Sequence, residues 1–580
     1  MRSPYTLSRA LVLDRRWPLL VDLGVAAIAL AGFFALIKIA SYWLGRPIPA
    51  VDISQSISAL PLYAFYSVVR IGAAYLLSLL FAIGYGYVAA YNPRAEALMI
   101  AVLDILQSIP VLSFLPGVML AMVALIPTRQ LGIEMGAILL IFTGQVWNMA
   151  FSFYSSLKSI PRELREAANI YRFSAWQRFC QLELPYSAIG LVWNSMVSVA
   201  GGWFFLIACE MFVLGDRDFR LPGLGSFLQT AANSGNTRAV IWGLVTMVLI
   251  IVATDQLVWR PVIAWSDRFK FEMSESNDRV RSPILHLLQR STFVAALKEK
   301  TIQPVNERIY KSLAHRSAAQ TIHPLDEPEK RKIPPMAIVL GIAAAAVVLY
   351  AAMQALAMLR HLRLDEVKLL LMGAGATFLR VNTALLIASL WTIPVGVMIG
   401  FNPKLARITQ PITQIAASFP APFLFPIILI GLQYLGLGLG VGSIVLMLLG
   451  TQWYILFNVI AGAMAIPSDL REVSDLFHFK GLQRWTTVIL PGIFPYLITG
   501  LVTASGGAWN ASIIAEYYSL RGHTLQTLGL GAQISAASDK GQFPILLMAT
   551  MIMAGMVVTI NRLVWRRMYR LAETRYKLEG

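Results

Sequence analysis

Residues 165–185 read REAANIYRFSAWQRFCQLELP, a charged and amphipathic segment inside a chain that is otherwise strongly apolar. A related segment contains Glu472. Of the 580 residues, 57% are hydrophobic and only 14% are charged, and the mean hydropathy is +0.64. A membrane span needs about 20 mostly apolar residues, and the stretches around both segments are long enough. The composition therefore predicts a polytopic helical membrane protein, interrupted twice by polar segments.

The formal net charge of +17 is spread over the ends of the apolar stretches. Positive-inside sorting explains this distribution better than a nucleic-acid patch does. Basic residues precede the first apolar stretch, at Arg15 and Arg16, and follow the last one, at Arg566 and Arg567. We therefore expect a multi-pass protein in a lipid bilayer, with both termini in the cytoplasm and no nucleic-acid partner.

Gly, Pro and charge breaks divide the chain into about twelve spans in two sets of six. The first set is expected at 18–45, 60–90, 97–126, 131–158, 186–214 and 238–262. The second set is expected at 336–358, 368–400, 406–433, 438–462, 492–515 and 543–565. The resulting organisation is a cytoplasmic tail at 1–17, a six-span unit at 18–262, a polar cytoplasmic linker at 263–335, a second unit at 336–566 and a tail at 567–580.

The two units match residue by residue, which indicates an internal duplication. Matching positions first differ by 310, and after a four-residue deletion they differ by 306. Pairs in the two registers include Arg70 and Arg380, Asn92-Pro93 and Asn402-Pro403, Trp203 and Trp509, Glu210 and Glu516, and Gly223-Leu224-Gly225 and Gly529-Leu530-Gly531. Because each unit has an even number of spans, the repeats are parallel.

Each polar segment lies between the fourth and fifth spans of its unit, at 159–185 and 465–491. Pro161 suits a helix start, Glu166 lies early in that helix, and Ser174 with Gln177 can form a capping box for a second short helix. Two short cytoplasmic helices are therefore predicted in each unit. Physical reasoning alone leaves two roles open, namely docking of a partner protein or lying in the lipid headgroup region.

The pattern of Ile-Pro, Glu-Ala-Ala and a Leu-Pro exit within a six-span unit resembles the permease subunits of bacterial type I ABC importers. The likeness covers both units and is similar to the nitrate, sulfonate and bicarbonate branch. It implies an all-α permease fold of two parallel six-helix repeats in the bacterial cytoplasmic (inner) membrane. It also implies that the polar segments couple to ATPases through these residues: Glu166, Ala167, Ala168, Arg172, Ser174, Glu472, Val473, Ser474 and His478.

Two departures from the family pattern stand in these segments. Arg172 and His478 occupy a turn where the family usually has Gly, and a residue with a Cβ is strained there if φ is positive. The second copy reads Glu472-Val473-Ser474, so it retains only the Glu. The two segments are therefore predicted to dock with unequal strength.

No Gly-x-x-x-x-Gly-Lys-Ser/Thr loop occurs in the sequence, so the chain lacks the phosphate cradle of an ATPase. The resemblance then implies two separate ABC ATPase subunits, which use ATP and Mg, and an extracytoplasmic substrate-binding protein. The chain itself is expected to bind no cofactor and no metal and to carry no catalytic residues. A membrane enzyme is disfavoured because no metal-spaced cluster of His, Cys, Asp or Glu appears in the sequence.

The expected translocation pathway lies between the two units, where paired prolines break a span in each. Polar groups near these breaks could offer neutral hydrogen-bond donors to a small anion. The candidates are Gln107, Ser108, Pro110, Ser113, Ser418 and Pro420. Glu210 and Glu516 are added as ionisable groups within or near the membrane, either as pathway groups or as structural groups bonded to neighbours.

Two further expectations concern the outer side of the membrane. Arg70 and Arg380 are expected to snorkel at span ends, and the two Gly-Leu-Gly motifs are expected in external loops that a binding protein touches.

The principal alternative is a secondary transporter of the major facilitator type, which also has two parallel six-span repeats. The loops at Asn92-Pro93 and Asn402-Pro403 lack that group's Gly-x-x-x-Asp-Arg pattern, and its plan does not explain the repeated polar segment. The sequence thus favours an ABC importer permease for a small anion.

Overall fold

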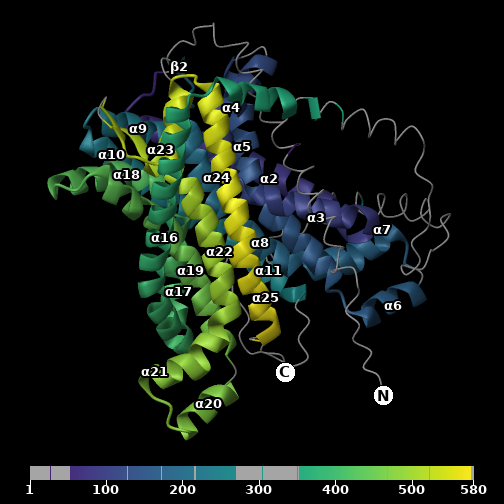
Figure 1. Cartoon of the computed structure of the whole chain (residues 1–580). Helices are drawn as coiled ribbons and strands as arrows, with labels where there is room; N and C mark the ends of the chain where they lie inside the picture. The colour runs from purple at the N-terminus through teal and green to yellow at the C-terminus, as the bar shows by residue number, and fades with distance from the viewer. Residues whose placement is uncertain are drawn as a thin grey trace.

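The computed structural model describes residues 52–269 and 352–575, apart from 127–128, 172, 215–216, 467 and 521–522, together with a few isolated positions. The predicted span 18–45, most of 336–358, and the linker beyond residue 269 lie outside the described residues. The described part of the chain is almost entirely helical, and its two halves repeat the same order of elements (Figure 1).

The first half is built around three long helices, α2 (Leu60–Tyr91), α5 (Arg129–Lys158) and α8 (Leu184–Glu210), which pack side by side. The remaining elements of this half are η2 (Ile57–Ala59), α3 (Pro93–Ser108), η3 (Val111–Phe114), α4 (Leu115–Leu125), α6 (Arg162–Ile170), α7 (Ala175–Arg178), η4 (Phe179–Glu183), β1 (Val213–Leu214), β2 (Arg217–Asp218), α9 (Leu224–Asn233), α10 (Thr237–Thr254), η5 (Asp255–Trp259), α11 (Arg260–Ser266) and η6 (Asp267–Phe269).

The second half repeats this plan around α16 (Leu364–Phe401), α19 (Leu439–Ala465) and α22 (Leu490–Ala515). Its other elements are η8 (Leu359–His361), α17 (Pro403–Ser418), α18 (Ala421–Tyr434), α20 (Ser468–Leu476), α21 (Gly481–Arg484), η9 (Trp485–Ile489), β3 (Tyr517–Leu520), β4 (His523–Gln526), α23 (Leu530–Asp539), α24 (Phe543–Ile560), η10 (Asn561–Trp565) and α25 (Arg566–Arg575).

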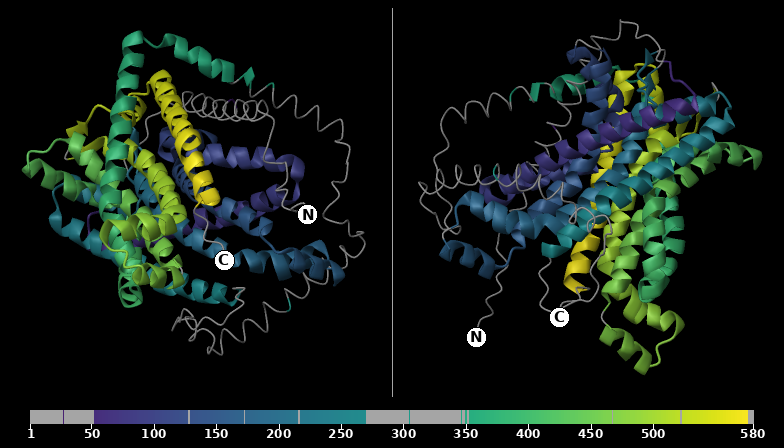
Figure 2. Two further views of the ribbon diagram at one scale, coloured as in Figure 1. Left: turned by 60° about the horizontal axis from the view of Figure 1, so that its bottom comes forward. Right: turned by 180° about the vertical axis from the view of Figure 1, so that it is seen from behind.

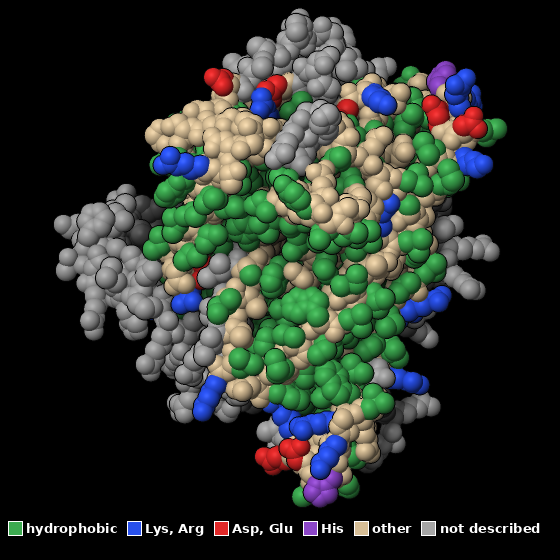
Figure 3. All heavy atoms as spheres, turned by 90° about the vertical axis from the view of Figure 1, so that its left-hand side faces the viewer, with side chains coloured by type: hydrophobic (Ala, Val, Ile, Leu, Met, Phe, Trp, Pro, Cys, Tyr) green, Lys and Arg blue, Asp and Glu red, His purple; other side chains and the backbone are tan. Residues whose placement is uncertain are grey.

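Within the described ranges, eight helices are long and apolar enough to cross a membrane, and two shorter apolar helices accompany them. The large apolar side chains that face outward, such as Leu80 and Leu390, are exposed to the surroundings of the protein. Figure 3 shows a broad hydrophobic surface on one side of the molecule, with charged side chains gathered mainly toward its two ends. This distribution fits a bilayer, whose apolar interior accepts such side chains and excludes charges.

The spans expected at 97–126 and 406–433 are broken, as the paired prolines predicted. In the first half α3 ends at Ser108 and a 3₁₀ turn precedes α4, while in the second half α17 ends at Ser418 and α18 begins at Ala421. Pro110 and Pro420 immediately precede the new helical segments and have extended backbone. A proline has no N–H to donate to the preceding turn, so the helix ends before it.

The two halves are joined by apolar side chains, because each half inserts one into the core of the other. Phe423 of α18 is fully buried in the core of the first half, and Leu112 of η3 is buried in the core of the second half. The hydroxyl of Tyr518 also donates a hydrogen bond of 2.8 Å to the Gln229 side chain across the boundary. The described parts of the two halves therefore form one packed body.

A short antiparallel hairpin follows the fifth span of each half. Val213 pairs with Asp218 in the first, and Tyr517 pairs with Gln526 in the second. Each hairpin leads into a short helix, α9 or α23, which packs against the next span, α10 or α24. We call this side of the molecule the hairpin end. In the second half, α20 and α21 lie at the opposite end of the long helices, as Figures 1 and 2 show.

Candidate functional site

The first polar segment, residues 159–185, projects a short helix away from the long spans (Figure 1). Glu166 is exposed on α6, whereas Ala168 is buried with 4% exposure. The guanidinium of Arg165 donates a hydrogen bond of 2.7 Å to the Leu157 carbonyl, near the end of the preceding span. The helix is therefore anchored on one face and presents the other face, with Glu166, outward.

The second polar segment, residues 465–491, uses equivalent positions in the same way. Arg471 donates to the Ala463 carbonyl at 2.7 Å and stacks 4.5 Å from the ring centroid of Phe401. Glu472 and Val473 are exposed, and Ser474 is buried with 1% exposure. A small residue is thus kept at the buried position although the Ala-Ala pair is not. Figures 1 and 2 show α6 and α20 apart from each other, each projecting beyond the long helices.

The turn that follows each short helix differs from the glycine turn usual in the family. His478 has φ of 53°, in the left-handed region where a side chain adds strain. Three residues later Gly481 also has a positive φ, of 52°. The strain predicted for a residue with a Cβ is confirmed at His478, while Arg172 lies outside the described residues.

The predicted capping box is confirmed. The Ser174 hydroxyl accepts from the Gln177 amide, and the Gln177 side chain accepts from the Ser174 amide at 2.8 Å. The fifth span, expected at 186–214, begins earlier, because helix runs without interruption from Ala175 to Glu210.

A π-helical turn explains why the proline does not end that helix. The Leu184 amide donates to the Phe179 carbonyl, five residues back, and the Leu490 amide donates to Trp485 in the same way before Pro491. The wider turn shifts the hydrogen-bond register where the proline lacks its N–H. Each polar segment is thus joined by continuous helix to the fifth span of its half.

At the base of the first segment lies a buried carboxylate that the second segment lacks. Glu183 is fully buried and accepts hydrogen bonds from the Tyr91 hydroxyl and from Arg178 Nε at 2.8 Å. The equivalent residue in the second half is Ile489, which is also buried. The two segments therefore differ both in their exposed residues and in how they are attached.

At the hairpin end of the first half, Glu210 holds the loop before α9 to the second span. Its carboxylate accepts hydrogen bonds from Ser67 Oγ at 2.6 Å, from Arg70 Nη1 at 2.9 Å and from the Gly225 amide at 2.8 Å. A methyl group built on Gly223 would lie 2.3 Å from the Glu210 carboxyl carbon. The carboxylate fits only because this position is glycine.

The second half repeats the arrangement with matching residues. Glu516 accepts from Thr377 Oγ1 at 2.8 Å, Arg380 Nη1 at 3.0 Å and the Gly531 amide at 2.9 Å. We call each set of four groups, Ser67, Arg70, Glu210 and Gly225 or Thr377, Arg380, Glu516 and Gly531, a glutamate clasp. Arg70 also bonds Glu134, whereas Gly440 stands at the equivalent position of the second half.

The clasps correct one expectation and bear on two others. Arg70 does not snorkel, since it is buried with 3% exposure and bonds two carboxylates. Glu210 and Glu516 have no exposed surface and are bonded to neighbouring residues, which is the structural one of the two roles that the sequence left open. The two Gly-Leu-Gly motifs are likewise buried beside these carboxylates. Sequence periodicity could not reveal this, because it does not indicate which loop folds back into the protein.

The remaining pathway candidates are placed in different ways. Gln107 is exposed, and its amide nitrogen lies 3.3 Å from the Asn148 side-chain oxygen. Ser113 is fully buried and donates to the Pro110 carbonyl at 2.7 Å, so its hydroxyl is already used. Pro110 and Pro420 are buried, and the side chains of Ser108 and Ser418 lie outside what the structure describes.

Asn148 and Tyr454 were missed by sequence reasoning, although they occupy equivalent positions in the two halves. Tyr454 reaches the first half, where its hydroxyl lies 3.4 Å from a methyl group built on Gly201 of α8. Because the two residues differ in type, the repeat comparison gave no signal for them.

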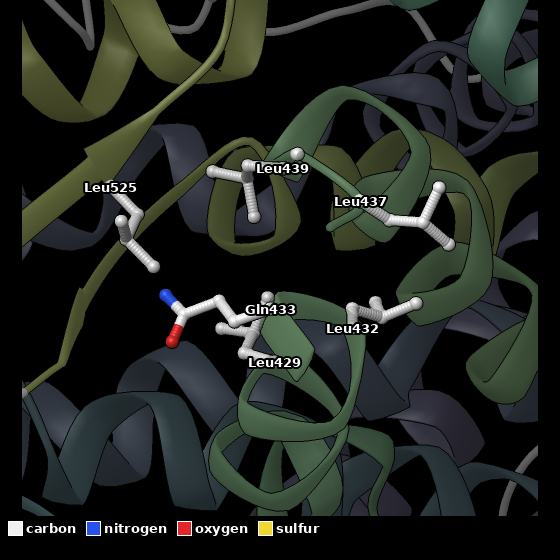
Figure 4. A pocket seen from close by; sticks show the side chains of 7 residues that line it. Leu429, Leu432, Gln433, Leu437, Leu439 and Leu525 are labelled. Atoms are coloured by element: carbon white, nitrogen blue, oxygen red, sulfur yellow. The ribbon is translucent and has the colours of Figure 1, made fainter. Parts of the chain in front are cut away.

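A small pocket of about 100 Å³ lies at the hairpin end of the second half (Figure 4). Leucines from α18, α19 and β4 line it, together with Gln433. All of its lining residues belong to one half, so it is not part of the boundary between the halves.

Comparison with known proteins agrees with this geometry. Residues 82–258 and 392–577 each match the family described as binding-protein-dependent transport system inner membrane component. The bicarbonate transport system permease protein of Synechococcus elongatus is 30% identical over 24% of this chain and 49% of its own length. The nitrate import permease protein of Leptolyngbya laminosa is 28% identical over 24% of this chain and 50% of its own length. The taurine transport system permease protein of Escherichia coli is 29% identical over 28% of this chain and 56% of its own length.

The chain thus spans about half the length of these relatives. The two family matches cover more than half of the chain and fall one on each half of the structure. The duplication inferred from paired residues therefore coincides with two copies of one family unit. The chain belongs to the family of binding-protein-dependent transport system inner membrane components, as a duplicated multi-pass member.

Proposed function

We propose that the chain is the permease component of an ATP-driven importer, with a translocation pathway between its two halves. Two separate ABC ATPase subunits dock on α6 and α20, and their ATP- and Mg-dependent closure changes the relation between the halves. The observation that carries this proposal is the repeated, anchored and outward-facing short helix, with Arg165 or Arg471 bonded to the preceding span.

The continuous helix behind each docking segment supports mechanical coupling. A force applied at α6 reaches the fifth span through α7 and the π-helical turn, since no loop intervenes between Ala175 and Glu210. The proposed contact residues are Glu166, Ala167, Arg172 and Ser174 in the first segment and Glu472, Val473 and His478 in the second. Ala168 and Ser474 serve the same function from the buried face, by allowing each helix to lie close to the span.

The proposed cargo is a small anion. The printed names of the relatives specify bicarbonate, nitrate and taurine, all of which are compact and carry oxyanion groups. Among the predicted pathway residues whose side chains the structure describes, Gln107 supplies an exposed polar group next to the broken span. An extracytoplasmic binding protein delivers the anion to the hairpin end, and both termini of the chain lie in the cytoplasm.

A secondary transporter of the major facilitator type is not favoured. That plan gives no reason for two anchored helices between the fourth and fifth spans, and both halves match a family of binding-protein-dependent systems.

The test is co-purification of the tagged full chain from native membranes, followed by identification of the retained proteins. Wild type should retain an ATPase that contains a phosphate-binding loop, and the double variant Glu166→Lys with Glu472→Lys should lose it. Asp365→Lys is the matched control, because Asp365 is exposed at the start of α16, far along that helix from α20. Equal retention by the double variant and the control would refute docking at these helices.

A further inference from the structure

Gln145 of α5 is a buried polar side chain that lacks a hydrogen-bond partner in the described part of the chain. Its exposure is 0%, and neither its amide nitrogen nor its amide oxygen has a hydrogen-bond partner among the described residues. A buried amide without partners is unfavourable, and such groups in native proteins call for an explanation, of which a functional role is one. An apolar side chain of similar size would fill the same space at lower cost.

The Gln145 amide packs against α8 at a glycine, where the helix has no side chain. A methyl group built on Gly202 would lie 2.1 Å from Gln145 Nε2, so the amide occupies the space that a side chain at Gly202 would need. Ser198 lies one helical turn earlier on the same side of α8, and its buried hydroxyl also has no partner among the described residues. Two buried polar side chains without a hydrogen-bond partner among the described residues are thus associated with this part of α8.

The neighbouring residue on α8, Gly201, is directed toward the second half. Gly201 faces the Tyr454 hydroxyl of α19, at 3.4 Å from its built methyl position. Tyr454 is half-buried. Because Gly201 and Gly202 have no side chains, Tyr454 of the second half and Gln145 of the first half both come close to the α8 backbone here.

The helix segments around Gln145 and Tyr454 carry no charged residues. The sequence has no charged residue between Glu134 and Lys158 on α5, none on α8 before Glu210, and none on α19. An amide N–H and a phenolic O–H can donate to an oxyanion without a fixed positive charge. Transport requires binding that is weak enough for release, which neutral donors favour over a buried cation.

We infer that Gln145 and Tyr454 form a neutral donor site for the transported anion at the boundary between the halves. This inference rests on the proposed function and names the side chains that contact the cargo. When the halves move relative to each other, α8 shifts against α19, and both donors can turn to one anion beside the Gly201-Gly202 backbone. Gln107 and Asn148 are bonded to each other. Asn148 lies three residues beyond Gln145 on α5, toward the first polar segment, so an anion delivered at the hairpin end reaches this pair after the site.

The test uses the full chain reconstituted with its ATPase subunits and binding protein in liposomes. Uptake of labelled nitrate, bicarbonate and taurine is measured for wild type, Gln145→Met and Tyr454→Phe, each at equal ATPase retention. The matched control is Thr451→Val, because Thr451 occupies the position equivalent to Gln145 and its hydroxyl donates to the Met447 carbonyl of its own helix.

Both site variants should raise the KM for uptake at least tenfold, with ATPase retention unchanged and the control within twofold of wild type. Gln145→Met should also unfold at a temperature equal to or above that of wild type, because it removes an unpaired buried amide. A KM within twofold of wild type for both variants, or a lowered unfolding temperature for Gln145→Met, would overturn the inference. Failure of wild type to retain any ATPase would instead refute the proposed function, which the co-purification tests separately.

Discussion

Glu210 and Gly225 are joined by a hydrogen bond of 2.8 Å from the Gly225 amide to the Glu210 carboxylate, and Glu516 and Gly531 are joined at 2.9 Å in the second half. In both halves the same carboxylate also binds an arginine and a hydroxyl from the second span. The duplication has therefore preserved a complete polar network, not only isolated residues. The network ties the loop at the hairpin end to the spans.

Removal of the carboxylate should be strongly destabilising. Glu210→Ala leaves the buried guanidinium of Arg70 with Glu134 as its carboxylate partner and with the Pro222 carbonyl, and breaking a buried ion pair costs about 3–5 kcal/mol. Thermal unfolding of the purified chain in nanodiscs would measure the loss. The control is Glu134→Ala, since Glu134 is partly exposed and Glu210 would still pair with Arg70. Unfolding of both variants at the same temperature would contradict the central role of Glu210.

The glycine before α9 should not tolerate a methyl group. In Gly223→Ala the new carbon would lie 2.3 Å from the Glu210 carboxyl carbon, and in Gly529→Ala it would lie 2.1 Å from a Glu516 carboxylate oxygen. Both variants are expected to lose folded yield in the membrane, as measured by size-exclusion chromatography of a fluorescent fusion. Gly72→Ala is the control, because nothing lies within 4 Å of its built methyl group and Ala favours the helix by roughly 0.5–1 kcal/mol. Normal yield of the Gly223 and Gly529 variants would refute the clasp geometry.

The turn after α20 should be improved by glycine. His478 has φ of 53°, which costs a residue with a side chain about 1 kcal/mol or more. His478→Gly should therefore protect the second polar segment from limited proteolysis and strengthen ATPase retention. Gly481→Ala is the opposite control, since Gly481 also has a positive φ and nothing lies near its built methyl group. More cleavage in His478→Gly than in wild type would show that the turn is not strained.

Much of the fold could be predicted from the sequence because apolar length and punctuation indicate spans directly. The duplication, the breaks at Pro110 and Pro420, and the Ser174 capping box all depend on local patterns that sequence displays. The helix through Pro185 was not predictable in this way, because a π-helical turn leaves no distinct sequence signal.

The polar network at the hairpin end shows what the sequence could not supply. Arg70 and Glu210 are 140 positions apart, and their pairing depends on how the loop before α9 folds back onto the second span. Comparison of the two repeats showed that Arg70 is equivalent to Arg380 and Glu210 to Glu516. It did not show which residues bond to each other. Tyr454 gave no signal at all, because its equivalent is Asn148 and no local pattern indicates contact between the halves.

The most direct test of the account is native mass spectrometry of the complex isolated from membranes, to count ATPase subunits on each chain. Two docking helices on one chain predict two ATPase subunits per chain for wild type and one for Glu166→Lys or Glu472→Lys alone. One ATPase subunit per wild-type chain, or two retained by the double variant, would contradict the claim that α6 and α20 each dock an ATPase.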